Sequence, residues 1–183
     1  MLRCTVRFAA GLFFAGVLCR AQVPGVWLDV PFVAQKDNMC GAATLAMVLQ
    51  YWEREQGKRL GSDVNQIERL LYSPQARGIF ASDMEGYLQQ QGLLTFQFRG
   101  NWVDLQQHLQ KGRPLIVALS NGHRDLHYVV VAGLDSTEDV ILKNDPAERK
   151  LLKQNRTSFE QQWKAAGNWT LLAVPQQSDR SSQ

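Results

Sequence analysis

A polar loop runs directly into a helical segment at Gln35-Lys36-Asp37-Asn38-Met39-Cys40-Gly41-Ala42-Ala43. Apolar residues then recur at helical spacing, which predicts a helix over 40–52 with Ala43, Met47 and Tyr51 or Trp52 on its buried side. The small side chains at 41–43 allow this helix to pack tightly against a sheet. We therefore expect a helix-on-sheet contact to begin at Cys40.

Helices are predicted mainly in the first half of the chain and strands mainly in the second. Helical spacing and capping residues predict helices over 63–72, 82–91, 102–111 and 157–165. Alternating or continuous apolar runs predict strands over 26–32, 94–98, 114–119, 127–134, 139–143, 150–152 and 169–174. This order of elements predicts an α+β fold, in which an N-terminal helical layer packs on a C-terminal antiparallel β-sheet.

Residues 1–21 have the layout of a secretory signal peptide. Arg3 and Arg7 precede an apolar run over 8–18, and Ala21 is a small residue at the position where cleavage is expected. The apolar run is shorter than the roughly 20 residues that span a bilayer. We therefore expect export to the periplasm or the extracellular space. The alternative is an N-terminal segment that stays uncleaved and anchors the protein in the membrane.

The chain after residue 21 is expected to form one formally neutral domain. Residues 22–175 suit a single domain with a substantial core, and the polar segment 176–183 is expected to be a disordered tail. The chain has 20 Lys and Arg residues against 17 Asp and Glu, and residues 1–21 hold three of the Arg residues and no acid. The excess positive charge therefore belongs to the signal peptide. Nothing in the charge indicates a nucleic acid as a partner.

Cys40 is the one cysteine outside residues 1–21, so it has no partner for an intrachain disulfide. It is predicted at the first turn of a helix, where unpaired backbone N–H groups favour the thiolate that a nucleophile needs. Gly41 lets a substrate approach the backbone at this point. A buried structural cysteine is the alternative, since that is the commoner fate of a free cysteine.

Three further residues could complete a cysteine-dependent site. His127 begins an apolar strand, which would hold its ring rigidly as a general base for Cys40. Asp145 comes at the end of the next strand and could hold the imidazole in one tautomer, although Asn144 could serve instead. Gln35, in the polar loop, could donate a hydrogen bond to an oxyanion together with the Cys40 N–H. The simpler alternatives are a histidine bonded within the sheet, a turn-forming aspartate and a solvent-facing glutamine.

Three blocks of sequence carry a family resemblance: Val30-Pro31-Phe32-Val33-Ala34-Gln35…Cys40-Gly41-Ala42-Ala43, His127-Tyr128-Val129-Val130-Val131 and Asn144-Asp145-Pro146. Together they resemble the papain-like cysteine peptidases typified by the double-glycine bacteriocin-leader peptidases, over nearly all of the chain after the signal peptide. The resemblance implies a papain-like fold and hydrolysis of a peptide or protein substrate. It also implies that Cys40 is the nucleophile, His127 the base, Asp145 the orienting residue and Gln35 the oxyanion donor.

The chain also departs from that family. Met39 stands where the leader peptidases often have Asp, and Gln35 is one residue closer to the cysteine than is usual. Those peptidases are typically fused to a membrane transporter and face the cytoplasm, whereas this chain carries a predicted export signal, so a double-glycine leader is not the expected substrate. Two alternatives stay open: an acyltransferase that passes the acyl group to an amine or thiol, and a non-catalytic peptide-binding module on the same fold.

The sequence carries no sign of a metal site or a cofactor. His123 and His127 are four residues apart, which is the spacing of zinc ligands on a helix. Gly122 before them and the β-branched run after them predict a strand instead, so we expect no metal here. The sequence carries no signal for an oligomeric state either.

Overall fold

The computed structural model describes residues 25–120 and 126–176 of the 183-residue chain. The predicted signal peptide over 1–21, His123 and all but the first residue of the predicted tail over 176–183 lie outside the described residues. Within the described part, no helix combines the length and the apolar character needed to cross a bilayer.

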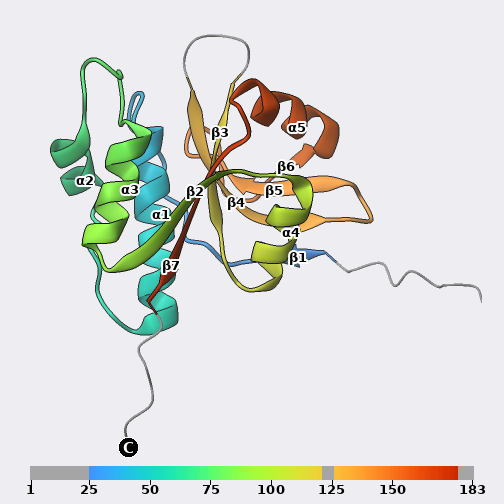
Figure 1. Cartoon of the computed structure of the whole chain (residues 1–183), viewed down its shortest axis with the longest axis horizontal. Coiled ribbons are helices and arrows are strands. Elements are labelled where there is room, and N and C mark those ends of the chain that lie inside the picture. Colours follow the sequence, from blue (N-terminus) through green and yellow to red (C-terminus); the bar gives the residue numbers. More distant parts are fainter. Residues whose placement is uncertain (1–24, 121–125, 177–183) are drawn as a thin grey trace, which may run out of the picture.

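An antiparallel sheet runs through the molecule and positions the rest of the fold (Figure 1). Its strands are β1 (Val26–Trp27), β2 (Leu93–Arg99), β3 (Leu115–Leu119), β4 (His127–Asp135), β5 (Val140–Asn144), β6 (Leu152–Asn155) and β7 (Trp169–Pro175). The strand order is β2-β7-β3-β4-β5-β6. β1 pairs with the far end of β4, beyond the part of β4 that pairs with β3.

Helices cover both faces of this sheet. Those in the described part are α1 (Cys40–Gln56), α2 (Val64–Leu71), α3 (Ala81–Gln90), α4 (Trp102–Gln110) and α5 (Arg156–Ala165). Side chains alternate along β3, so they divide the core in two. Ile116 and Ala118 pack with α1, α2 and α3, whereas Leu115, Val117 and Leu119 pack with α4 and α5. The predicted α+β fold is confirmed, and α4 and α5 add a helical layer on the opposite face.

α1 is the buried helix of the fold, and its first ten residues are all buried. Figure 1 shows it between the sheet and the pair α2 and α3. Trp52 Nε1 donates to the Ala173 carbonyl at 2.9 Å, and the Tyr51 hydroxyl donates to the Gly112 carbonyl at 2.8 Å. Helical spacing placed either Tyr51 or Trp52 on the buried side of this helix, but both are buried and hydrogen-bonded. These bonds fix the helix that begins at Cys40.

The first strand is shorter than the strand predicted over 26–32. The Leu28 N–H still donates to the Ala132 carbonyl at 2.7 Å, but the Val30 N–H turns back to the Leu28 carbonyl at 2.8 Å. Pro31 follows and has no N–H to donate. The buried Asn144 amide then donates to the carbonyls of Val30 and Pro31, at 3.1 and 3.4 Å. A side chain rather than a β-ladder therefore holds the segment that leads to Cys40.

The other elements lie close to their predicted ranges, and the largest displacement is that of β6. The strand expected over 150–152 begins instead at Leu152. Leu151 has a φ of 51°, and its N–H donates to the Asn144 side-chain oxygen at 2.9 Å. This left-handed residue ends the turn that follows β5, so the ladder can begin only after it.

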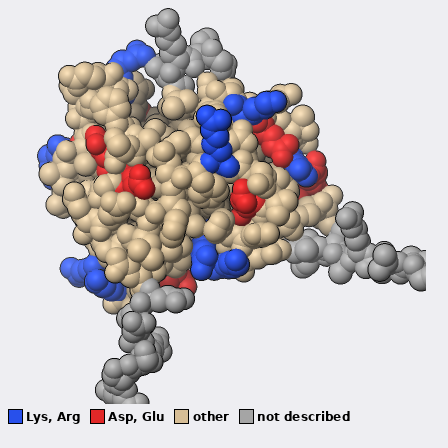
Figure 2. Space-filling model, in the orientation of Figure 1, with Lys and Arg blue, Asp and Glu red and all other residues tan. Residues whose placement is uncertain are grey.

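Charges of both signs are interspersed on the face of the molecule shown in Figure 2. Ion pairs also join residues near the surface of the described part, among them Lys153 with Glu138 at 2.6 Å and Arg156 with Glu160 at 3.0 Å. The described residues on this face form no broad basic area of the kind that would follow a nucleic-acid backbone.

Candidate active site

Cys40 is the first residue of α1 and lines a cleft. The residue is buried, with 8% of its surface exposed. The first backbone N–H groups of a helix have no intrahelical partner, and no side chain in the described part of the chain caps those of α1. The Tyr128 N–H, on β4, donates to Sγ at 3.5 Å. The sulfur thus lies among backbone N–H groups, which is the kind of environment in which reactive cysteines are found.

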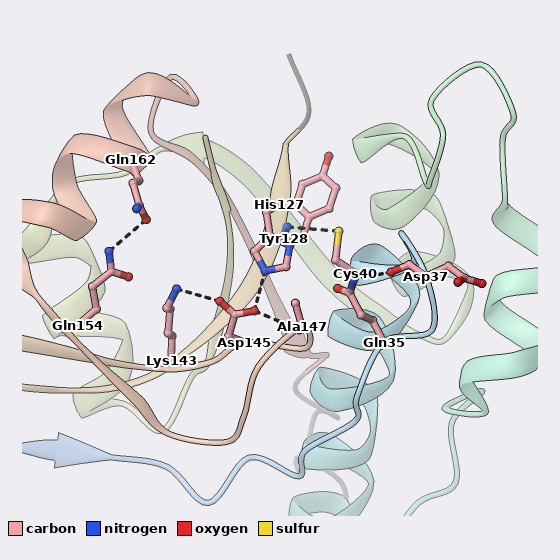
Figure 3. Close-up of polar contacts among 10 residues, drawn as sticks. All are labelled: Gln35, Asp37, Cys40, His127, Tyr128, Lys143, Asp145, Ala147, Gln154 and Gln162. Atoms are coloured by element: carbon pink, nitrogen blue, oxygen red, sulfur yellow. Dashed lines mark hydrogen bonds and ion pairs between the residues drawn. The ribbon is translucent and has the colours of Figure 1, made fainter. Parts of the chain in front are cut away.

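His127 joins Cys40 to Asp145 (Figure 3). It is the first residue of β4 and pairs with Leu119 of β3. Its Nε2 lies 2.6 Å from Asp145 Oδ1, and its other ring nitrogen is hydrogen-bonded to the Cys40 sulfur. The structure therefore brings these three predicted residues together from α1, β4 and the end of β5.

Asp145 is held by both of its carboxylate oxygens. It follows β5 and is buried, with 2% of its surface exposed. Oδ1 accepts from the Ala147 N–H at 3.1 Å as well as contacting His127, and Oδ2 accepts from Lys143 Nζ at 2.9 Å. Because each oxygen has its own donor, the carboxylate is held in the orientation that meets the imidazole.

Hydrogen bonds in this cluster raise the pKa of His127 and lower the pKa of Asp145. Burial by itself lowers the pKa of His127, but the hydrogen bonds to Asp145 and Cys40 outweigh burial and raise that pKa to about 9. Burial raises the pKa of Asp145, but the hydrogen bonds from His127 and Lys143 outweigh it and lower that pKa to about 2. At neutral pH an imidazolium therefore lies beside an ionised carboxylate, and it can donate a proton to a leaving group.

Gln35 lies in the loop before α1, and Figure 3 shows its amide beside Cys40. Its Nε2 donates to the Asp37 carbonyl, and its Oε1 is buried with no hydrogen-bond partner in the described part of the chain. The Gln35 backbone N–H donates to the Pro146 carbonyl at 2.9 Å. This bond ties the loop to the turn after Asp145, so the two ends of the predicted site are physically linked.

Asn144 does not contact the imidazole, and the alternative in which it orients His127 is wrong. Its side-chain nitrogen donates to the backbone carbonyls of Val30 and Pro31, and its oxygen accepts from the Leu151 N–H. The side chain is completely buried. Asn144 therefore fastens the segment before Cys40 to the end of β5, while the neighbouring Asp145 faces the site.

Sequence analysis missed Lys143, whose ammonium group lies 2.9 Å from Asp145 Oδ2. Its side chain is 7% exposed, which is rare for a lysine and requires a partner. Side chains two residues apart on a strand point to the same face, so Lys143 and Asp145 share one side of β5. The position of Lys143 two residues before Asp145 is the signal that could have identified it. The alternation of apolar and polar residues over 139–143, however, also fits a lysine that faces solvent.

The cleft beside Cys40 has a volume of about 530 Å³. Gln35, Cys40 and His127 line it together, and the segment 76–81 contributes a further part of its wall. Leu126, 47% exposed, lies at the rim next to His127. The cleft therefore gives a ligand of several residues access to the sulfur, the imidazole and the Gln35 amide at once.

In the described residues no cluster of three His, Cys, Asp or Glu side chains could hold a metal ion. Both ring nitrogens of His127 are already engaged, one by Asp145 and the other by Cys40. This side chain consequently has no free nitrogen to offer to a metal, and it begins a strand rather than lying on the helix that zinc-ligand spacing would require.

Three solved structures share the fold of this chain. The peptidase domain of Streptococcus ComA, a bi-functional ABC transporter involved in a quorum sensing pathway, is 22% identical, with a TM-score of 0.64 over 80% of this chain and 99% of that domain. A double glycine motif protease from an AMS/PCAT transporter, in complex with the leader peptide, is 22% identical, with a TM-score of 0.63 over 85% and 100%. A putative C39-like peptidase from Bacillus anthracis is 20% identical, with a TM-score of 0.64 over 84% and 99%.

No curated protein sequence matches this chain. The model of the Peptidase_C39 like family, however, matches residues 27–171, a range that includes Gln35, Cys40, His127 and Asp145. The fold agrees with that match, because its structural neighbours are C39 peptidase domains. The chain therefore belongs to the Peptidase_C39 like family.

Proposed function

We propose that the protein is an exported cysteine peptidase that hydrolyses peptide bonds with Cys40 as nucleophile, His127 as general acid and base, and Asp145 as orienting residue. The observation that carries this proposal is the continuous chain of contacts from the Cys40 sulfur through the His127 ring to the Asp145 carboxylate, beside an open cleft. A module that only binds peptides has no need for a cysteine and an imidazole within hydrogen-bond reach of each other.

Acylation begins when the Cys40 thiolate attacks the carbonyl carbon of the scissile bond. A C–S bond forms, and the electron pair of the C=O double bond moves to oxygen. The His127 imidazolium gives its proton to the amide nitrogen, the C–N bond breaks and the amine leaves. Asp145 keeps the ring aligned throughout, because both of its oxygens are held.

Deacylation returns the enzyme to its starting state. The neutral His127 accepts a proton from water, and the resulting hydroxide attacks the thioester carbonyl. The C–S bond then breaks, and the thiolate and a carboxylic acid are released. If an amine took the place of water at this step the product would be a new amide, so product analysis with an added amine separates hydrolysis from acyl transfer.

Gln35 and the backbone of Cys40 are proposed to stabilise the tetrahedral oxyanion. The Cys40 N–H is at the uncapped start of α1, where the helix offers partial positive charge. The Gln35 amide lies next to the sulfur, and one N–H of its Nε2 remains after the bond to the Asp37 carbonyl. Loss of one such donor typically lowers kcat by a factor of about 10²–10³.

A peptide is the proposed substrate. The related double glycine motif protease was solved in complex with a leader peptide, which supports peptide binding in this fold. The cleft volume of about 530 Å³ suits several residues of an extended chain.

Digestion of a peptide library under reducing conditions tests the activity. Cys40→Ala should abolish cleavage, with unchanged far-UV circular dichroism as the control for folding. Iodoacetamide should label wild-type protein at Cys40 and abolish cleavage in parallel. Cleavage that survives in the Cys40→Ala protein would overturn the proposal.

Export is proposed from the charged and apolar pattern of residues 1–21. Expression of the full chain in a host with a secretory pathway, followed by fractionation and N-terminal sequencing, should give a protein outside the cytoplasm that begins at Gln22. An intact N-terminus in the membrane fraction would favour the anchor, and an intact N-terminus in the cytosol would contradict export.

A further inference from the structure

A second cavity lies beside Asp145, on the side of His127 away from Cys40. Its volume is about 490 Å³, and its wall includes His127, Lys143, Asp145, Glu148 and Gln154. Figure 3 shows Lys143 and Gln154 on the far side of Asp145 from the sulfur. His127 lines both this cavity and the Cys40 cleft, so the imidazole stands where the two spaces meet.

Two polar groups in the wall of this cavity have unused hydrogen-bonding capacity. The Lys143 ammonium has three N–H donors, and the one acceptor it meets in the described part of the chain is Asp145 Oδ2. Gln154 Oε1 is buried with no partner among the described residues, while its Nε2 donates to Ser158 Oγ at 3.3 Å and to Gln162 Oε1 at 3.1 Å. A buried donor and a buried acceptor therefore face one cavity, and unsatisfied groups of this kind are uncommon in native proteins.

We propose that this cavity binds a main-chain amide of the leaving segment of the peptide substrate, the segment that begins with the scissile nitrogen. Its carbonyl oxygen accepts from Lys143 Nζ, and its N–H donates to Gln154 Oε1. The proposal rests on the peptidase function proposed above. The scissile nitrogen receives its proton from the His127 ring nitrogen that faces Cys40, in the first cleft. Because the same ring also lines the second cavity, the leaving segment passes the edge of the imidazole to reach it.

The charges around the cavity favour a neutral amide over a carboxylate or an ammonium group. Lys143 shares Asp145 with the His127 imidazolium, and Lys153 is paired with Glu138 at 2.6 Å, so together with Glu148 the three cations meet three carboxylates. Glu148, exposed at the edge of the cavity, would repel a carboxylate. An ammonium group would meet the buried ammonium of Lys143. A peptide amide meets one donor and one acceptor and adds no charge.

The test compares two substrates that share the same acyl segment, chosen from a peptide that the wild-type protein cleaves in the library digest. In one the leaving group is 7-amino-4-methylcoumarin, and in the other it is an Ala-Ala-Ala amide. We expect Gln154→Leu to lower the ratio of kcat/KM for the long over the short substrate by about fivefold, the size of one neutral hydrogen bond. The chemistry of the two leaving groups is the same for every variant, so it cancels when the ratios are compared.

Two controls sharpen the comparison. Ser158→Ala removes one partner of the Gln154 Nε2 and leaves Oε1 in place, so it should keep the wild-type ratio. Gln110→Leu makes the same change as Gln154→Leu at an exposed position on α4 and should also keep it. An unchanged ratio in Gln154→Leu overturns this inference alone. A wild-type protein that cleaves neither substrate nor any library peptide overturns the peptidase function, and this inference with it.

Discussion

At the scale of single residues, the site is a row of hydrogen-bonded side chains that begins at Cys40 and ends in a buried lysine. Lys143 is bonded to Asp145, Asp145 to His127 and His127 to Cys40. Isolated buried charges are strongly disfavoured, so each member of the row depends on its neighbour. Lys143 therefore stabilises the charge of Asp145 on the side that the imidazole does not reach.

Removal of the Lys143 ammonium should destabilise the protein. In Lys143→Met, Asp145 Oδ2 loses its buried donor, and we expect the free energy of unfolding in urea to fall by about 3 kcal/mol. Lys153→Met is the matched control, because Lys153 is exposed and water screens its pair with Glu138, so this substitution should change the free energy of unfolding far less. Equal effects of the two substitutions would contradict a structural role for the buried pair.

The dependence of kcat/KM on pH should separate Asp145 from its neighbour Asn144. In the wild-type protein the alkaline limb should lie near pH 9, where the His127 imidazolium loses its proton. Asp145→Asn removes the carboxylate that raises the pKa of His127, so the limb should move to lower pH. Asn144→Ala should lower stability and leave the limb in place, because Asn144 contacts backbone rather than the ring.

The opposite result, in which Asn144→Ala moves the alkaline limb and Asp145→Asn does not, would exchange the two roles. A direct titration of the His127 ring by NMR in both variants gives the same comparison without turnover. Both measurements report the pKa of His127. A general loss of stability would not change that pKa.

At the scale of secondary-structure elements, close backbone approach sets where β1 can pair. β1 meets β4 at Gly133, and a Cβ at this position would lie 2.6 Å from the Val26 carbonyl oxygen and 2.8 Å from Trp27 Cβ. The pairing of β4 with β5 also shifts register between Val131 and Gly133. Such irregularities often accompany glycine in strands, because no side chain hinders the neighbouring backbone.

Gly133→Ala should therefore destabilise the protein, whereas Gly86→Ala should not. Gly133→Ala forces β1 away from β4, and we expect a loss of about 1–3 kcal/mol in the free energy of unfolding. Gly86→Ala lies within α3, where an added Cβ meets nothing within 4 Å, and should stabilise by about 0.5–1 kcal/mol. Thermal or urea unfolding measures both, and the same sign for the two changes would refute this account.

At the scale of the whole molecule, the titration of Asp145 contributes to acid unfolding. The pKa of Asp145 in the folded protein is about 2, below its ordinary value of 3.8. The ionised carboxylate therefore stabilises the folded state above about pH 4, and this stabilisation is lost as the pH falls toward 2. We expect the stability difference between wild-type and Asp145→Asn proteins to shrink by about 2 kcal/mol between pH 4 and pH 2. Urea unfolding at both pH values measures this, and a constant difference would show that Asp145 titrates normally.

The sequence determined those features that depend on neighbours along the chain. The helix from Cys40, the apolar strands and the order of elements follow from local periodicity, and their existence is confirmed. Two ends differ most: the first strand ends at Trp27 rather than at residue 32, and the helix from Cys40 runs to Gln56 rather than to residue 52. Cys40, His127, Asp145 and Gln35 could be chosen because each residue type has a distinct chemistry and a suitable local position. That these residues come together in space is implied by the family resemblance alone, because spacing along the chain does not give distance in space.

Only the tertiary structure decided what each buried side chain meets. Val30 and Asn144 are 114 positions apart, yet their contact holds the segment before Cys40 and turns the Asn144 side chain away from His127. The burial of Lys143, and that of the Gln154 oxygen that meets no partner among residues 25–120 and 126–176, likewise depend on segments packed from elsewhere in the chain. The physical reason is that the energy of a buried polar group depends on the partner it finds, and that partner comes from the fold rather than from the neighbouring sequence.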